Sequence, residues 1–227
     1  MKPSAAYIKT SVSNVSLCSV VLFLLISGLA GRAQNPPAGL DLFNGRDFTG
    51  WTGYMKTNAD LWKSWSITNG VIHCTGRPSG YLRTEKSYDN YHLTVEWRFV
   101  KVAPHHDNTG VLVHLQDQQK IWPECIECQG QYLKQGDFWL HSGASATGFP
   151  SDGKKSVHVP MAGPPHEKTP GEWGTYEVIA KGDTVEIIVN GKSMNQLSGA
   201  NITSGFIGLQ SEGAEIEVRK VWLEPLK

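Results

Sequence analysis

The sequence lacks an excess of either charge, because Lys and Arg number 21 together and Asp and Glu also number 21 in 227 residues. It therefore lacks the basic surface that attracts nucleic acids and anionic membranes, and we expect no nucleic-acid partner. Cysteine is scarce as well. Without Cys18 the remaining cysteines are Cys74, Cys125 and Cys128, and an odd number cannot form a complete disulfide framework within one chain.

Long apolar runs are missing except near the N-terminus, where Val20 to Leu29 reads VVLFLLISGL after Lys2 and Lys9. A run of about ten residues is short for a membrane span, which needs roughly 20, so a signal peptide is favoured over an uncleaved anchor. We expect residues 1–33 to be removed, leaving a tail over 34–39 and one domain over 40–227. The mature protein would be periplasmic or extracellular, without stable membrane insertion. The sequence does not indicate an oligomeric state.

Helical periodicity is almost absent from the mature chain, which instead contains strand-length runs of alternating apolar and polar residues. Asn69-Gly70 and Asn190-Gly191 interrupt two of these runs and predict tight hairpins. The pattern predicts an all-β single domain, an antiparallel sandwich. Further strands are expected at Tyr91 to Val100, Gly110 to Gln116, Thr175 to Gly182, Ser204 to Gln210 and Ala214 to Leu226. Residues 142–171 are predicted to form a long loop with one short strand at SVHVP, and this loop is either functional or an ordinary surface loop.

The segment from Ile121 to His141, IWPECIECQGQYLKQGDFWLH, concentrates polar and aromatic residues. If residues 125–129 are extended, Cys125, Glu127 and Gln129 share one face, and Cys128 lies on the other. The two cysteines would then point apart, which disfavours a zinc or redox pair.

Neighbouring strands extend the same argument to a mixed polar face. Val111, Val113 and Leu115 are expected on one side of their strand and His114 on the other. The predicted polar face of one sheet consists of Glu96, Arg98, His114, Glu127 and Gln129. Outward faces of sandwiches are normally polar, but carboxylate, guanidinium, imidazole and amide groups together suit hydroxyl recognition and proton transfer.

Several segments in fixed order carry a resemblance to a known family: LFNGRDFTGW, GYLRTEKSYDNYHLTVEWRF, NTGVLVH, IWPECIECQ with GDFWL, EKTPGEWGTYEVIAKGDTVEIIVNG and FIGLQSEGAEIEVRKVWLEPL. From about Leu40 to the C-terminus the chain resembles the exported bacterial family called domain of unknown function 1080, the 3-keto-disaccharide hydrolase domain. The resemblance implies a concanavalin A-like jelly-roll sandwich acting on glycosides oxidised at sugar carbon 3. The matching polar residues are Arg98, Asn108, His114, Glu127 and Gln129.

A ketone at carbon 3 acidifies the proton on carbon 2, so a base could start β-elimination of the carbon 1 oxygen, followed by water addition. We expect His114 or Glu127 as base. Arg98 or a divalent ion would stabilise the oxyanion, although no compact metal motif demands an ion. Gln129 and Asn108 would orient hydroxyls, with Glu96 as a further substrate contact. Trp122, Trp139 and Trp173 are candidates for sugar stacking or for the core.

Three alternatives stay open. An ordinary glycosidase needs two carboxylates across the anomeric carbon, and Glu124 and Glu127 would point to opposite faces, although a partner from a distant strand could serve. A non-catalytic carbohydrate-binding module could share the fold, and a structural or adhesion module is the third alternative.

The remaining histidines lie in loops or next to them. His105-His106-Asp107 is read as a solvated turn. The remaining candidates to rim a pocket are His141, His158 and His166.

Overall fold

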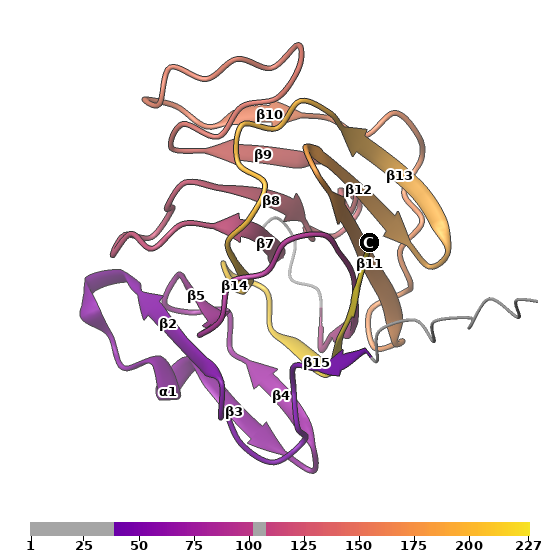
Figure 1. The fold of residues 1–227 in the computed structure, drawn as a ribbon. Helices are drawn as coiled ribbons and strands as arrows, with labels where there is room; N and C mark the ends of the chain where they lie inside the picture. Colours follow the sequence, from indigo (N-terminus) through magenta and orange to yellow (C-terminus); the bar gives the residue numbers. More distant parts are fainter. Residues whose placement is uncertain (1–38, 102–107) are drawn as a thin grey trace, which may run out of the picture. The chain divides into compact units, whose positions relative to one another are not determined.

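The computed structural model describes residues 39–101 and 108–227, which form two antiparallel sheets (Figure 1). Sheet A runs β13 (Lys192–Leu197), β12 (Thr184–Val189), β11 (Gly174–Lys181), β6 (Tyr91–Phe99), β15 (Ile216–Pro225), β4 (Val71–Cys74) and β3 (Trp65–Thr68), with β1 (Leu40–Asp41) paired to β15. Sheet B runs β10 (Val157–Val159), β9 (Phe138–His141), β8 (Cys125–Gln129), β7 (Gly110–Leu115), β14 (Phe206–Ser211), β5 (Gly80–Thr84) and β2 (Trp51–Met55). The short helices η1 (Lys56–Asn58) and α1 (Leu61–Ser64) connect β2 to β3.

The hydrophobic core lies between the sheets, because its main cluster draws on both. In β6, buried and partly exposed residues alternate along the whole strand, so that Leu93, Val95 and Trp97 face inward. Val111 and Val113 of β7 in sheet B belong to the same cluster. Burying a large apolar side chain contributes about 1.5–3 kcal/mol, which is why the alternating pattern fixes the sandwich. The predicted all-β, two-sheet domain is confirmed.

The two Asn-Gly dipeptides form the expected hairpins. Asn69 and Gly70 have φ values of 53° and 76° between β3 and β4, and Asn190 and Gly191 have 49° and 79° between β12 and β13. Positive φ at both central residues matches the twist of the flanking strands. The short strand predicted within residues 142–171 is β10, at the edge of sheet B beside β9.

Some predictions fall outside the described residues. These are the signal peptide, the tail apart from Gly39, and the His105-His106-Asp107 segment. In the described part of the chain, no helix is long and apolar enough to cross a membrane.

The prediction for His114 is wrong, because β7 carries a bulge opposite β14. The partners of Phe206 and Gly208 are Leu115 and Leu112, so two residues of β7 lie between these pairs where β14 has one. His114 adopts a φ of 51°, and its ring packs edge-on at 6.2 Å from the core residue Tyr91. Bulges break the alternation of a strand. His114 is therefore fully buried in the interior and Leu115 turns to the opposite face, beside Leu112.

Gly205 sits against this bulge and supports a first prediction. A Cβ there would lie 2.4 Å from the backbone carbonyl carbon of His114, so Gly205→Ala should destabilise the fold by about 1–3 kcal/mol through overpacking. Chemical denaturation measures the change. Gly163→Ala is the matched control, since a Cβ there meets nothing within 4 Å. Equal stability of the two variants would contradict the bulge geometry.

Candidate active site

Strand β8 carries the site on the face of sheet B that points away from the core. Ile126 and Cys128 belong to the main core, whereas Glu127 and Gln129 line a cavity on the other side. Cys125 packs in a separate small cluster, so the two cysteines point apart as predicted. Burial raises the pKa of both thiols well above the usual value, which keeps them protonated and unreactive.

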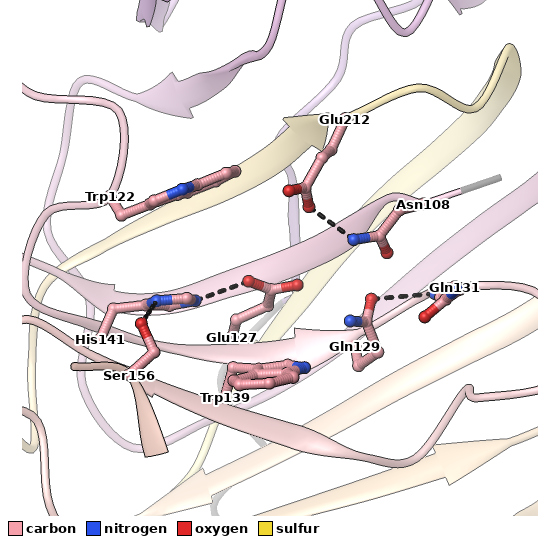
Figure 2. Close-up of a pocket in the computed structure, with 9 residues that line it drawn as sticks. All are labelled: Asn108, Trp122, Glu127, Gln129, Gln131, Trp139, His141, Ser156 and Glu212. Atoms are coloured by element: carbon pink, nitrogen blue, oxygen red, sulfur yellow. Dashed lines mark hydrogen bonds and ion pairs between the residues drawn. The ribbon is translucent and has the colours of Figure 1, made fainter. Parts of the chain in front are cut away.

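The cavity has a volume of about 260 Å³ and is framed by side chains from several strands and loops (Figure 2). Its lining residues are Asn108, Trp122, Glu127, Gln129, Gln131, Trp139, His141, Ser156 and Glu212. Five of these were predicted site residues: Asn108, Trp122, Glu127, Gln129 and Trp139. A cavity that combines two rings with convergent polar groups has the composition of a small-molecule site.

A buried carboxylate and imidazole form its centre. His141 Nε2 donates to Glu127 Oε2 at 2.7 Å, and both side chains are less than a tenth exposed. Nδ1 of the same ring forms a second hydrogen bond, with the Ser156 hydroxyl, also at 2.7 Å. The chain Ser156–His141–Glu127 therefore fixes the direction in which the carboxylate points.

The other oxygen of this carboxylate has no partner. Glu127 Oε1 is buried and makes no hydrogen bond to any described residue, while Figure 2 shows the carboxylate directed into the cavity. Gly110 on the adjacent strand makes room for it, since a Cβ there would lie 3.2 Å from both Glu127 Cγ and Oε1. A buried oxygen without a partner is costly, so its position suits an incoming ligand proton.

Glu212 faces the same cavity from the turn after β14. Its Oε2 accepts from Asn108 Nδ2 at 2.6 Å, and the two residues also form a backbone bridge. Burial, and then the negative charge of Glu127, raise the pKa of Glu212 to about 8. Glu212 is therefore largely protonated at pH 7 and can donate a proton while Glu127 accepts one.

Aromatic rings form two walls. Trp122 stacks on the His141 ring at 5.6 Å between centroids, and Trp139 stacks on His158 at 4.5 Å. His158 Nε2 donates to Asp137 Oδ2 at 2.7 Å, and this contact holds the His158 ring against Trp139. Flat rings held in this way offer surfaces for the apolar faces of a small ring compound.

Gln129 lines the same cavity and offers it a hydrogen-bond donor. It is 3% exposed, and its Oε1 accepts from the backbone N–H of Gln131 at 3.0 Å. This contact leaves the amide NH₂ group without a protein acceptor among the described residues, so it can donate to a ligand oxygen.

Besides His114, three predicted site residues lie elsewhere. Glu96 and Arg98 are on β6, which belongs to sheet A and not to the sheet of β7 and β8, and Trp173 directly precedes β11 of sheet A. Glu96 pairs with Arg219 at 2.7 Å, and Arg98 pairs with Glu217 at 2.6 Å. The guanidinium groups of Arg98 and Arg219 each lie over the Trp173 ring, 4.6 and 4.5 Å from its centroid. The prediction that Glu96 and Arg98 share a face with Glu127 is wrong, and Trp173 does not line the cavity.

Four lining residues were not among the predicted catalytic or binding residues: Gln131, His141, Ser156 and Glu212. His141 was only one of three histidines that could rim a pocket. The available signal was the hairpin register, because pairing Glu127 with Trp139 places His141 opposite Cys125 on the same face. No feature of the sequence around Glu212 indicated that this residue belongs to the site.

A divalent ion stays a prediction. Within residues 39–101 and 108–227, no group of three or more His, Cys, Asp or Glu side chains is arranged to hold one.

Comparisons with known proteins agree with the fold. Residues 40–224 match the 3-keto-alpha-glucoside-1,2-lyase-like domain. The chain belongs to this family. No curated protein matches it.

Among solved structures, a presumed glycosyl hydrolase from Parabacteroides distasonis is 23% identical with a TM-score of 0.60, covering 83% of this chain and 94% of its own. A Bacillus licheniformis β-glucanase shares the fold at 12% identity and a TM-score of 0.52, with 82% of this chain and 96% of that chain covered. The Bacillus subtilis carbohydrate-binding module CBM66 shares it at 14% identity and a TM-score of 0.52, with 77% of this chain and 95% of that chain covered. These likenesses confirm the concanavalin A-like jelly roll.

The raised pKa of Glu212 predicts a pH-dependent stability difference. Glu212 holds its proton to a higher pH in the folded protein than in the unfolded one, where its pKa is 4.5. The resulting contribution to the free energy of unfolding is fully present below pH 4.5 and is lost as the pH rises through about 8. Glu212→Gln keeps the Asn108 contact without the charge, so its melting temperature relative to the native protein should increase between pH 4.5 and 8.5. We expect at least about 2–4 °C, the shift that about 1 kcal/mol produces at this size.

Calorimetry at the two pH values measures this difference. The matched control is Glu85→Gln at an exposed position, which should show no such trend. A difference between the Glu212 variant and the native protein that stays constant with pH would contradict the raised pKa.

Proposed function

We propose that this protein cleaves glycosides already oxidised to a ketone at sugar carbon 3, by elimination followed by addition of water. The observation that carries the proposal is that one cavity holds Glu127, an oriented carboxylate with a free oxygen, together with Glu212, a second carboxyl whose pKa is raised to about 8 by burial and by the Glu127 charge. Membership of the 3-keto-alpha-glucoside-1,2-lyase-like family supports this substrate class.

The first step removes the proton on carbon 2. Glu127 Oε1 takes this proton, and the electron pair of the C–H bond passes into an enolate on the carbon 3 oxygen. His141 holds the other oxygen of Glu127 in place. The amide NH₂ of Gln129, whose Oε1 is engaged with Gln131, would donate to the enolate oxygen and stabilise it.

The second step breaks the bond from carbon 1 to the leaving oxygen. The enolate collapses to a carbon 1–carbon 2 double bond, and Glu212 gives its proton to the departing oxygen. Water then adds to carbon 1 with loss of a proton to ionised Glu212, and protonated Glu127 returns a proton to carbon 2. Both carboxyl groups regain their starting states, and the net change is hydrolysis.

This assignment revises the roles expected from the sequence. Glu127 is the base rather than His114, whose burial lowers its pKa in the core. No role is left for Arg98, whose guanidinium pairs with Glu217 on sheet A. Trp122 and Trp139 would hold the faces of the oxidised sugar, and Asn108 positions Glu212. We further propose that the protein acts after export.

A second candidate function rests on the same two carboxyl groups. Glu127 and Glu212 come from distant strands to one cavity, so an ordinary glycosidase reaction on an unoxidised sugar has the required pair. A non-catalytic binding module has the rings but no need for a buried Glu–His contact beside a second carboxyl of raised pKa.

The substrate class is tested with a 3-keto-glucoside carrying a 4-nitrophenyl leaving group, beside the unoxidised glucoside. We expect release from the keto sugar only, and Glu127→Gln should lower kcat/KM by about 10²–10⁴ through loss of the base. Release from the unoxidised glucoside would favour the ordinary glycosidase. Retained sugar binding without release from either would favour the binding module. A chelator arm reports whether a divalent ion contributes.

The acid is tested through the leaving group. Glu212→Gln should slow cleavage of methyl 3-keto-glucoside by about 10²–10⁴, because methoxide needs a proton, and slow the nitrophenyl substrate much less. For the native protein, kcat/KM on the methyl substrate should fall as pH rises through about 8, when Glu212 ionises. Equal losses on both substrates would rule out general acid catalysis by Glu212.

A further inference from the structure

Helix α1 carries an aromatic side chain that the core does not use. Trp62 is 50% exposed, whereas every other tryptophan, tyrosine and phenylalanine in residues 39–101 and 108–227 is buried or partly buried. An indole left in water costs the fold apolar burial, so core packing does not account for this position.

A second ring supports Trp62 from one side. Phe48 packs against the main core and stacks on the indole, with 4.8 Å between the ring centroids and 27° between the ring planes. Phe48 covers one face of the indole, and the half exposure of Trp62 leaves the other face open to solvent. We call this pair the Phe48–Trp62 platform.

Local hydrogen bonds order the backbone on both sides of the platform. In the turn that carries the phenylalanine, Asn44 Oδ1 accepts from the backbone N–H groups of Arg46 and Asp47 at 2.8 and 3.0 Å. At the start of α1, Asp60 Oδ1 accepts from the backbone N–H of Trp62 at 3.0 Å. A ligand therefore meets rings that are already in place and does not have to order them.

The area of the open face limits what can bind there. A tryptophan presents up to about 250 Å², so the exposed half offers roughly 125 Å². A stable protein interface buries about 800 Å² on each partner. The other exposed large apolar side chains in the described part of the chain, Leu40, Val100 and Leu133, belong to other elements of the fold. The platform is thus too small for a protein partner and comparable to the face of a sugar ring.

The charges beside the two rings favour a neutral ligand. Two basic and two acidic residues lie within two positions of the rings in the sequence, namely Arg46, Lys63, Asp47 and Asp60. An anionic membrane or a nucleic acid would need a basic cluster. A glucose ring suits the site, because its equatorial hydroxyls lie at the rim and its axial C–H groups give both faces an apolar surface for stacking.

We propose that the Phe48–Trp62 platform is a second carbohydrate-binding site, which holds glucose units of a neutral glucan on the open face of Trp62. Helix α1 follows β2, the strand at the opposite edge of sheet B from β9 and β10 (Figure 1). Four strand spacings separate β2 from β8, which is roughly 19 Å at about 4.8 Å each. The platform is therefore distinct from the cavity at Glu127, and it would keep the protein on a glucan and raise the local concentration of chain ends.

The test is affinity electrophoresis in native gels that contain laminarin, hydroxyethyl cellulose or soluble starch. At least one of these glucans should retard the native protein, and Trp62→Ala should raise the dissociation constant for that glucan about tenfold or more. Trp62→Phe keeps a ring and should stay within about threefold of the native value. The matched control is Leu133→Ala, which removes an equally exposed apolar side chain, at 51%, and should change nothing.

A cavity variant and a mass measurement separate the alternatives. Trp139→Ala should leave the retardation within about twofold, because that ring lines the cavity and not the platform. Retardation by none of the three glucans, or retardation lost in Trp139→Ala and kept in Trp62→Ala, would overturn the proposal. A native dimer in sedimentation equilibrium that Trp62→Ala converts to a monomer would overturn it in favour of self-association. Binding needs no reaction, so these outcomes do not depend on the proposed cleavage of 3-keto-glycosides.

Discussion

The burial of the Glu127 charge is the constraint on which the site depends. A carboxylate removed from water is costly unless it is hydrogen-bonded, and His141 meets this need at 2.7 Å. Ser156 in turn holds the His141 ring through a hydrogen bond, so the long loop after β9 supplies a residue of the site. The same charge helps to raise the pKa of Glu212 to about 8. In the proposed reaction, one buried anion therefore gives two chemically identical side chains the roles of base and acid.

The strands and hairpins could be predicted from alternation and turn residues, because these signals are local. Strand order is not local: β14 lies between β7 and β5, and β6 lies in the other sheet. This is why Glu212 gave no signal and why Glu96 and Arg98 were misplaced. His114 was misplaced by a single bulge. His141, by contrast, follows from the β8–β9 register and could have been found.

A second cavity, of about 360 Å³, adjoins the first, and different strands supply the walls of the two. Strands β8 and β9 and the loops beside them bring tryptophan rings and the Glu127–His141 contact, whereas the turns before β5 and after β14 bring glycines and Arg77. Rings suit the flat faces of a sugar, and a guanidinium suits hydroxyl groups. The aromatic and the polar walls thus come from different elements, and Glu212 lines both cavities.

Removal of the carbon 2 proton is the central claim, and its most direct test compares 4-nitrophenyl 3-keto-glucoside with the same substrate carrying deuterium at carbon 2. Nitrophenolate leaves without a proton from an acid, so removal of the carbon 2 proton should limit the rate, and the deuterated substrate should release nitrophenol several-fold more slowly. Equal rates for the two substrates would show that the bond at carbon 1 breaks without loss of that proton and would contradict the account.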